Sequence, residues 1–195
     1  MNIIFATNNE NKVAEIKAVV PPHINIISLK DAGIDIDIPE PHDTLQANAQ
    51  EKAATIYKLT GSGCFSEDTG LEVEALDGAP GVHSARYAGE DKAFDKNIDK
   101  LLTNLEGAQN RSAQFRTVIC LVQDDGKEHY FEGICKGTII NKRRGSEGFG
   151  YDPVFVPEDA TQTFAEMSME EKARYSHRRK ALDGLVTFLN SLPLK

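Results

Sequence analysis

The sequence has no tryptophan, only three cysteines and three methionines, and no long uninterrupted run of apolar residues. Nothing in it approaches the roughly 20 apolar residues that a bilayer-spanning helix needs. The first residues, 1–7, lack the basic segment and apolar core of a secretory signal, so we expect a cytoplasmic protein. The cysteines are scattered, without a C-x-x-C pair, which indicates reduced core thiols at Cys64, Cys120 and Cys135.

Positive charge is scarce as well. The 22 lysines and arginines are outnumbered by 30 aspartates and glutamates, which gives a net charge of −8 at pH 7. This balance argues against broad binding to nucleic acid or to an anionic membrane. It still allows an anionic small ligand in a local basic site. The phosphate loop G-x-x-x-x-G-K-[ST] is also absent, so any phosphate binding has to use another element.

The apolar pattern alternates between strand-like and helix-like segments. Asp125-Gly126 between two β runs indicates a hairpin. Because βα units are combined with this hairpin, the sequence predicts an α/β fold with a mixed sheet, of a length usual for one compact domain. The helix at 91–105 carries one apolar stripe, formed by Phe94, Ile98, Leu101, Leu102 and Leu105. We expect strands at 2–6, 24–28, 64–65, 71–76, 112–123, 128–140 and 154–156, and helices at 13–20, 44–59, 91–105, from 168, and at 178–192.

Three acidic residues stand out as candidate metal ligands. Glu67 and Asp68 follow the short apolar run Cys64-Phe65, where carboxylates are costly unless they bind something positive. Adjacent residues of an extended segment point to opposite sides, so we expect the two acids to have different roles. Glu40, in a loop, is a candidate to join them around Mg²⁺, which takes oxygen ligands. A carboxylate beside bound water can also accept its proton.

A polar turn follows the first expected strand. A turn between a strand and a helix N-terminus presents backbone N–H groups and the positive end of the helix dipole to an anion. Thr7 and Asn8 add neutral hydrogen-bond donors, and Lys12 adds a positive charge. The turn therefore suits a phosphate chain, although simple helix capping explains the same residues.

The segment Gly148-Phe-Gly-Tyr-Asp-Pro153 has the features of a base-binding loop. Glycines on both sides of Phe149 allow close backbone approach and could expose the ring for stacking on a base. Asp152 could accept hydrogen bonds from a purine edge. The structural alternative is a tight turn with a phenylalanine in the core.

A basic cluster lies close behind this loop. Lys172 is followed by Ser176-His-Arg-Arg-Lys180, in which His177 or Arg178 could donate to a carbonyl oxygen. A solvated basic helix turn explains the cluster equally well on its own. Taken together, a phosphate-binding turn, a metal centre, a stacking loop and a basic turn are what hydrolysis of a nucleoside triphosphate needs.

These motifs, in this order, resemble those of the inosine/xanthosine triphosphate pyrophosphatases, a family that removes deaminated purine nucleotides. They span nearly the whole chain, and five separated matches are far more specific than any one of them. The similar segments are Thr7–Lys12, Ser66-Glu-Asp-Thr-Gly-Leu71, Gly78-Ala-Pro-Gly81 through Ser84-Ala-Arg-Tyr87, Gly148–Pro153 and Ser176-His-Arg178.

The resemblance implies a fold, a reaction and a cofactor. The family fold is an elongated, two-lobed α/β structure with a long mixed β-sheet flanked by helices and a central cleft. Residues 1–195 would then form a single catalytic domain in a homodimer. The implied reaction is hydrolysis of ITP, dITP and XTP to the monophosphate and pyrophosphate, with Mg²⁺ as cofactor. The implied partners are purine nucleoside triphosphates, with no nucleic acid and no membrane.

The resemblance also implies roles for individual residues. Asp68 would be the catalytic proton acceptor and a metal ligand. Glu40 would be a further metal ligand. The position of Glu67 beside Asp68, and not the resemblance, leads us to expect that Glu67 supports the metal. The residues implied to bind the nucleotide are Thr7, Asn8, Asn9, Glu10, Asn11, Lys12, Thr69, Phe149, Gly150, Tyr151, Asp152, Lys172, His177 and Arg178.

One segment departs from the family's pattern. Where members commonly have E-x-G-x-T-[FL]-x-E-N-A, this chain has His42 for the glycine and Ala47 for the second acid, while Asn48 and Lys52 are retained. The loop carrying Glu40 is therefore the part of the site that the resemblance supports least. Two other functions stay open: a Maf-like nucleotide pyrophosphatase of different base choice, and a non-catalytic nucleotide-sensing module.

Overall fold

In the computed structural model, which describes residues 1–192, the chain forms two compact units. The first consists of residues 1–68, 117–133 and the described residues from 178 onwards; the second consists of residues 69–116 and 134–177. The strands are β1 (Asn2–Phe5), β2 (Asn25–Ser28), β3 (Cys64–Val73), β4 (Pro80–Gly81), β5 (Ser112–Val122), β6 (Glu128–Ile139) and β7 (Phe155–Pro157). The helices are α1 (Glu10–Lys17), α2 (Leu45–Thr60), α3 (Phe94–Asn104), α4 (Met169–Tyr175) and α5 (His177–Ser191).

The strands within residues 1–192 join in one sheet of seven, in the order β2-β1-β3-β5-β6-β7, with β4 paired to β3. β1 is parallel to β2 and β3, whereas the pairs β3–β4 and β6–β7 are antiparallel. The parallel register places Ile4 beside Ile27 on one side and beside Cys64 on the other. The predicted α/β fold with a mixed sheet flanked by helices is confirmed. None of the helices in this part of the chain has the length and apolarity that crossing a membrane requires.

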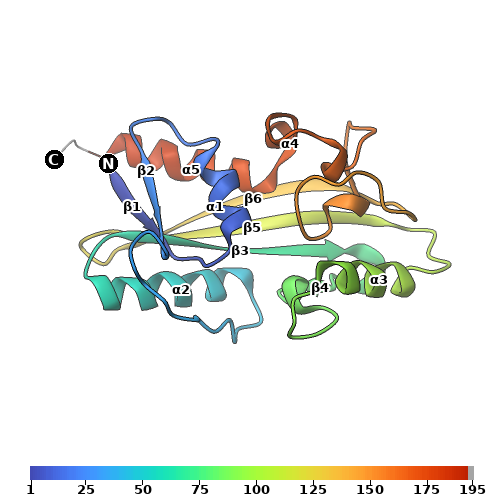
Figure 1. Ribbon diagram of the computed structural model, residues 1–195, viewed down its shortest axis with the longest axis horizontal. Coiled ribbons are helices and arrows are strands. Elements are labelled where there is room, and N and C mark those ends of the chain that lie inside the picture. The colour runs from blue at the N-terminus through green and yellow to red at the C-terminus, as the bar shows by residue number, and fades with distance from the viewer. Residues whose placement is uncertain (193–195) are drawn as a thin grey trace. The chain divides into compact units, whose positions relative to one another are not determined.

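Helices cover both faces of the strands in the first unit (Figure 1). On one face, α1 and α5 pack over Phe5 and Phe65, whose rings stack with centroids 4.5 Å apart. On the other face, α2 packs through Ala49, Ala53 and Ile56. These three residues recur at helical spacing, and the small alanine side chains allow α2 to approach the strands closely.

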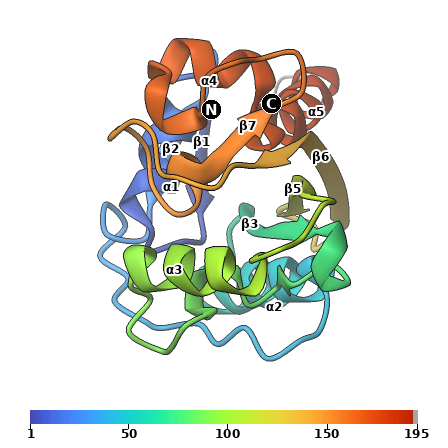
Figure 2. The ribbon, with the colours of Figure 1, turned by 90° about the vertical axis from the view of Figure 1, so that its right-hand side faces the viewer.

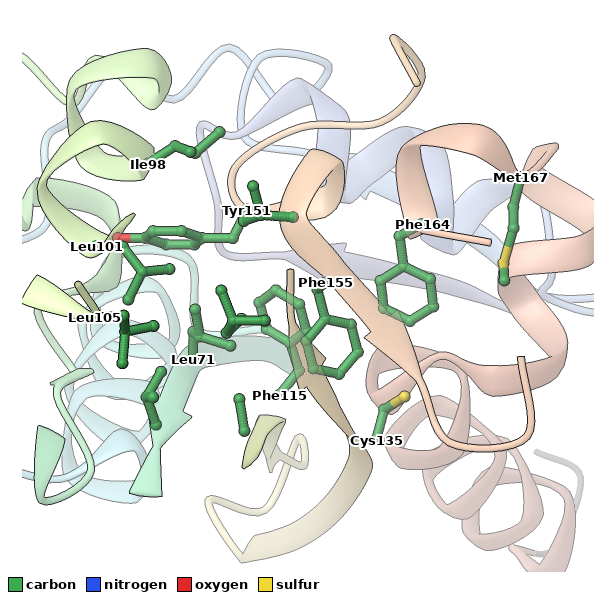
Figure 3. Packing of buried hydrophobic residues seen from close by; sticks show 14 residues of the cluster. Leu71, Ile98, Leu101, Leu105, Phe115, Cys135, Tyr151, Phe155, Phe164 and Met167 are labelled. Atoms are coloured by element: carbon green, nitrogen blue, oxygen red, sulfur yellow. The ribbon is translucent and has the colours of Figure 1, made fainter. Parts of the chain in front are cut away.

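The core of the second unit combines aliphatic side chains with a group of aromatic rings (Figure 3). Phe115 of β5 and Phe155 of β7 meet edge-on with centroids 4.7 Å apart, and Phe164 lies 5.2 Å from Phe155. Leu101 of α3 and Met167 complete this core from opposite ends, as Figure 3 shows. Figure 2 shows α3 on one side of this unit, with β7 and α4 on the other.

β3 differs from the two short strands expected at 64–65 and 71–76, because it runs unbroken from Cys64 to Val73. The acids Glu67 and Asp68 therefore lie inside a strand that pairs with its neighbours. Gly70 makes the continuous strand possible. A Cβ added there would lie only 2.6 Å from the carbonyl oxygen of Gly81 on β4, so a side chain at this position would push the two strands apart.

One helix lies close to its expected bounds, and another begins later than expected. α2 agrees with the helix expected at 44–59: Thr44 caps it by accepting from the Ala47 N–H at 3.2 Å, and Gly61 ends it with a φ of +64°. α3 begins at Phe94 and not at residue 91, because Lys92 has a φ of +50°, which a helix cannot continue through. Phe94, expected in the buried stripe, is 41% exposed.

Candidate functional site

The polar turn before α1 is a helix cap. The side-chain oxygen of Asn9 accepts from the N–H groups of Asn11 and Lys12, at 3.1 and 3.2 Å. The hydroxyl of Thr7 accepts from the Asn9 N–H at 3.2 Å. Two N–H groups at the helix start are therefore engaged by the cap, and α1 begins at Glu10, earlier than the apolar pattern indicates. Lys12 is the residue of this turn whose side chain reaches the buried acids described next.

Asn8 and Glu10 of the same turn contact other parts of the first unit. The Asn8 amide donates to the carbonyl oxygen of Ile36 at 2.7 Å. Glu10 forms an ion pair with Lys30 at 2.9 Å, in which both side chains are more than three-quarters exposed. Such a solvated pair contributes little to stability. The turn is thus anchored through Asn8 and presents Glu10 to solvent.

Glu67 is bound by two cations in the interior of the first unit. Both of its carboxylate oxygens accept from Nε of Arg178, at 3.0 and 2.8 Å, and Nζ of Lys12 lies 3.1 Å from Oε1. A second acid, Glu15 of α1, forms an ion pair with the same guanidinium. Burial by itself raises the pKa of Glu67, but Arg178 and Lys12 outweigh it and lower the pKa to about 2.

Asp68, the next residue of β3, has a different cationic partner. Nζ of Lys52 on α2 lies 3.5 Å from Oδ1 of Asp68 and also forms an ion pair with Glu40. The side chains of Lys52 and Asp68 are only 9% and 8% exposed. Burial raises the pKa of Asp68, while Lys52 and Lys12 act in the opposite direction. A buried carboxylate whose pKa is raised holds a proton more readily, which suits a general base.

Asp68 and Glu40 form a carboxylate pair that fits a divalent cation. They share one lysine, so the pair carries more negative charge than Lys52 neutralises. Mg²⁺ usually takes one or two carboxylates and completes its shell with water and phosphate oxygens. In residues 1–192, no group of three or more His, Cys, Asp or Glu side chains is arranged to hold a metal ion. Glu40, Glu67 and Asp68 are thus not gathered as one ligand set, and the donor chemistry fits the pair.

In the second unit, Phe149, Asp152 and Lys172 form a compact group. Oδ2 of Asp152 accepts from the Phe149 N–H at 2.9 Å and from Nζ of Lys172 at 2.6 Å. The same ammonium lies 5.2 Å from the centroid of the partly exposed Phe149 ring. Gly148 has a φ of +74°, and a Cβ there would lie 2.1 Å from Oδ2 of Asp152. The loop, including Gly150 at a φ of +62°, is therefore shaped around Asp152.

Two further residues of the expected base-binding motifs lie in the core of the second unit. His177 is 3% exposed, and its ring stacks on Phe115 with centroids 4.7 Å apart. Tyr151 is 4% exposed, and its hydroxyl donates to the carbonyl oxygen of Ser84 at 2.7 Å. Burial raises the pKa of Tyr151 above its ordinary value. These two side chains support the loop and the α4–α5 turn from within.

The segment from Gly78 to Tyr87 packs against the second half of β3, where Thr69 follows Asp68. The hydroxyl of Ser84 accepts from the Leu71 N–H at 2.8 Å and donates to the carbonyl oxygen of Gly81 at 2.6 Å. This arrangement ties the two glycine-containing motifs of the sequence to each other. The segment therefore has a clear structural task in the second unit.

The sequence places this chain in a known protein family. Residues 3–188 match the model of the Ham1 family. The chain belongs to the Ham1 family. It is 51% identical over 191 residues to a dITP/XTP pyrophosphatase of Flavobacterium psychrophilum, covering 98% of this chain and 100% of that protein. It is 54% identical over 188 residues to a dITP/XTP pyrophosphatase of Porphyromonas gingivalis, with 96% of each covered.

Solved structures of Ham1 proteins agree with the assignment. The Ham1 protein of Staphylococcus aureus is 38% identical, with a TM-score of 0.88 over 97% of this chain and 98% of that one. A HAM1 protein from Coxiella burnetii is 36% identical, with the same TM-score of 0.88 over 98% and 100%. The resemblance to the inosine/xanthosine triphosphate pyrophosphatases, stated from the motifs, is confirmed.

The loop that departs from the Ham1 pattern is held by an asparagine. The His42 N–H donates to the side-chain oxygen of Asn48 at 2.9 Å, and the Asn48 amide donates back to the His42 carbonyl oxygen at 3.1 Å. Both bonds use the backbone of residue 42, so they form with histidine as they would with glycine. The backbone two residues after Glu40 is therefore anchored to α2 despite the substitution.

Two charged residues in the ion pairs around the buried acids of β3 were not identified as such from the sequence. Glu15 was not singled out, although it stands three residues after Lys12 on the same face of α1. Lys52 was noted only as a retained residue of the family pattern, whereas it joins Glu40 to Asp68. The available signal was in both cases a charged residue on the inward side of an amphipathic helix, where burial requires a partner.

Proposed function

We propose that this Ham1 protein hydrolyses non-standard purine nucleoside triphosphates, namely ITP, dITP and XTP, to the monophosphate and pyrophosphate. The observation that carries the proposal is the buried Asp68, joined through Lys52 to Glu40, in a chain 51% identical to a protein named dITP/XTP pyrophosphatase. Removal of such nucleotides from the nucleotide pool is the corresponding role.

The proposed chemistry is attack of water on the α-phosphorus. Asp68 accepts the proton of this water, the new P–O bond forms the monophosphate, and the bond to pyrophosphate breaks. Lys52 keeps the Asp68 carboxylate in place, and Lys12 contributes positive charge near it. Glu40 and Asp68 are the residues that would hold Mg²⁺, which when bound neutralises charge on the phosphate oxygens.

Base recognition is assigned to the loop that carries Phe149 and to the first residues of α5. The partly exposed ring of Phe149 is suited to stacking on a purine, and Lys172 and Asp152 hold it in place. A keto group at purine position 6 would meet hydrogen-bond donors at the start of α5, from Arg178, His177 or the nearby backbone N–H groups. An amino group at that position would leave such donors poorly paired, so ATP should be rejected.

The proposals on cofactor, assembly and location are supported by the family resemblance and by the charge of the chain. We propose Mg²⁺ as the cofactor and one catalytic domain acting as a homodimer in the cytoplasm. The net charge of −8 supports a small-molecule substrate and argues against nucleic acid or membrane as a partner. The carboxylate pair of Glu40 and Asp68 supports a hard divalent cation.

The test is a panel of ITP, dITP, XTP, GTP and ATP with Mg²⁺, measuring released pyrophosphate. We expect kcat/KM for the deaminated purine nucleotides to exceed that for ATP by at least about 100-fold. Asp68→Asn should lower kcat by about 10²- to 10⁴-fold while nucleotide binding persists. Asp159→Asn is the matched control, because Asp159 is an exposed loop residue of the second unit.

Two results would favour the other functions. Binding of nucleotides without any pyrophosphate release would indicate a sensing module. Preference for modified pyrimidine or guanine nucleotides would indicate the base choice of a Maf-like enzyme. Retention of near-normal turnover by Asp68→Asn would remove Asp68 as the general base, whatever the substrate.

A further inference from the structure

Glu67 is the meeting point of two cations from distant parts of the chain. Lys12 comes from the first turn of α1 and Arg178 from the start of α5, and both reach one carboxylate whose side chain is completely buried. The side chain of Arg178 is only 3% exposed, and its guanidinium also forms an ion pair with Glu15. One acid of β3 thus ties the N-terminal turn to the last helix.

The charges around Glu67 are balanced before any metal is added. Two cations, Lys12 and Arg178, face two acids, Glu67 and Glu15. Both oxygens of Glu67 already accept hydrogen bonds from Nε of Arg178, and Oε1 is also bound by Lys12. A divalent cation placed on this carboxylate would be repelled by both neighbours and would have to displace these donors.

The charges around Asp68 are arranged in the opposite way. Two acids, Asp68 and Glu40, share the ammonium of Lys52. Lys12, whose charge also acts on Asp68, forms its ion pair with Glu67. A pair of carboxylates that shares one lysine gains from a divalent cation, because the cation supplies further positive charge. Glu67 and Asp68 are neighbours on the same strand, but they differ in the charged side chains that surround them.

We propose that Glu67 is a positioning residue that fixes the charged ends of Lys12 and Arg178, and that it is not a metal ligand. The kinetic consequences of this role rest on the proposed function, in which Lys12 binds the phosphates and Arg178 binds the base. Loss of the carboxylate releases both cations at once. The metal remains with Asp68 and Glu40.

The experiment compares Glu67→Gln with Glu40→Gln in two measurements. The first is binding of Mn²⁺ to the free full-length protein by titration calorimetry, which needs no turnover. We expect Glu67→Gln to bind Mn²⁺ within about twofold of the wild type, and Glu40→Gln to bind it at least about tenfold more weakly. The second is kcat/KM for dITP, which we expect to fall at least about tenfold in Glu67→Gln at an unchanged Mg²⁺ half-saturation.

A double-mutant cycle with Lys12→Met tests the positioning role itself. If Glu67 acts on the reaction largely through Lys12, the double variant should lose little more kcat/KM than the worse single variant. Glu67→Asp keeps the charge but withdraws the carboxylate, so it provides a second variant if Glu67→Gln does not fold. We expect it to lower kcat/KM without changing Mn²⁺ affinity.

The contrary outcomes are distinct. Weakening of Mn²⁺ binding by Glu67→Gln or Glu67→Asp to the extent seen in Glu40→Gln would make Glu67 a ligand and overturn the inference. Fully additive losses in the cycle with Lys12→Met would overturn the coupling. Wild-type protein that binds Mn²⁺ but does not hydrolyse dITP would refute the proposed function alone, since the Mn²⁺ affinities of the variants would still decide the role of Glu67.

Discussion

Nζ of Lys52 lies 3.5 Å from Oδ1 of Asp68 in the interior of the first unit, and the same ammonium group binds Glu40. Lys52 of α2 thereby joins Asp68 of β3 to the loop that carries Glu40. Because the three side chains are largely buried, each depends on the others for its charge. The variants below test this dependence and the other contacts of the site.

Lys52→Met should destabilise the protein and reduce its turnover. Removing the ammonium leaves two acids close together without their cation, which typically costs about 3–5 kcal/mol in buried pairs. The pKa of Asp68 should rise further, because the charge of Lys52 lowers it in the native protein. Urea unfolding measures the first effect. Lys58→Met, at an exposed position of the same helix, is the control and should change stability by less than about 0.5 kcal/mol.

The paired Glu67 predicts a loss of stability in acid. Its pKa is about 2 in the folded protein, against an ordinary value of 4.5, so it contributes stability that is complete above the ordinary value. This contribution, on the order of a few kcal/mol, is lost as the pH falls from 4.5, the ordinary pKa of glutamate, to about 2, the pKa of Glu67 in the folded protein. The difference in unfolding free energy between wild type and Glu67→Gln should therefore shrink as urea titrations are taken from neutral pH into acid. Glu170→Gln, whose side chain is 87% exposed in the native protein, should show no such trend.

Phe149→Ala should weaken nucleotide binding without unfolding the protein. Loss of a stacking ring costs about 1–3 kcal/mol per base, so KM for dITP should rise by roughly 5- to 150-fold. Equilibrium binding of dITP to an inactive Asp68→Asn background would separate affinity from turnover. Leu59→Ala removes an apolar side chain that is 58% exposed, near the end of α2, and should leave KM unchanged. An unaltered KM in Phe149→Ala would exclude stacking on this ring.

Gly70→Ala should destabilise the second unit through the backbone. The new Cβ would lie 2.6 Å from the carbonyl oxygen of Gly81, and backbone atoms on a paired strand cannot move aside cheaply. Overpacking of this kind costs about 1–3 kcal/mol or more. Thermal unfolding should show a clear fall in Tm. Gly184→Ala is the comparison, since its Cβ would meet a flexible ring at 3.2 Å, and we expect a smaller change.

Elements whose signals lie within a few neighbouring residues were predictable without a structure. The cap at Thr44, the end at Gly61 and the alternation of strands and helices depend on local conformational preference. The motif around Asp68 was also recognisable as a unit, because its residues adjoin each other in sequence. The helix start predicted at residue 91 was wrong, because the conformation of Lys92, at a φ of +50°, has no local signal.

The partners of the buried charges could be found only from the folded chain. Glu67 and Asp68 are neighbours in sequence and identical in chemical class, yet one faces Lys12 and Arg178 and the other faces Lys52. Arg178 lies 111 positions from Glu67 along the chain, and no local preference specifies such a contact. Composition and motif order pointed to acids that need cations. Which cation each acid received depended on how α1, α2 and α5 pack against β3, and that packing is set by apolar burial across the whole unit.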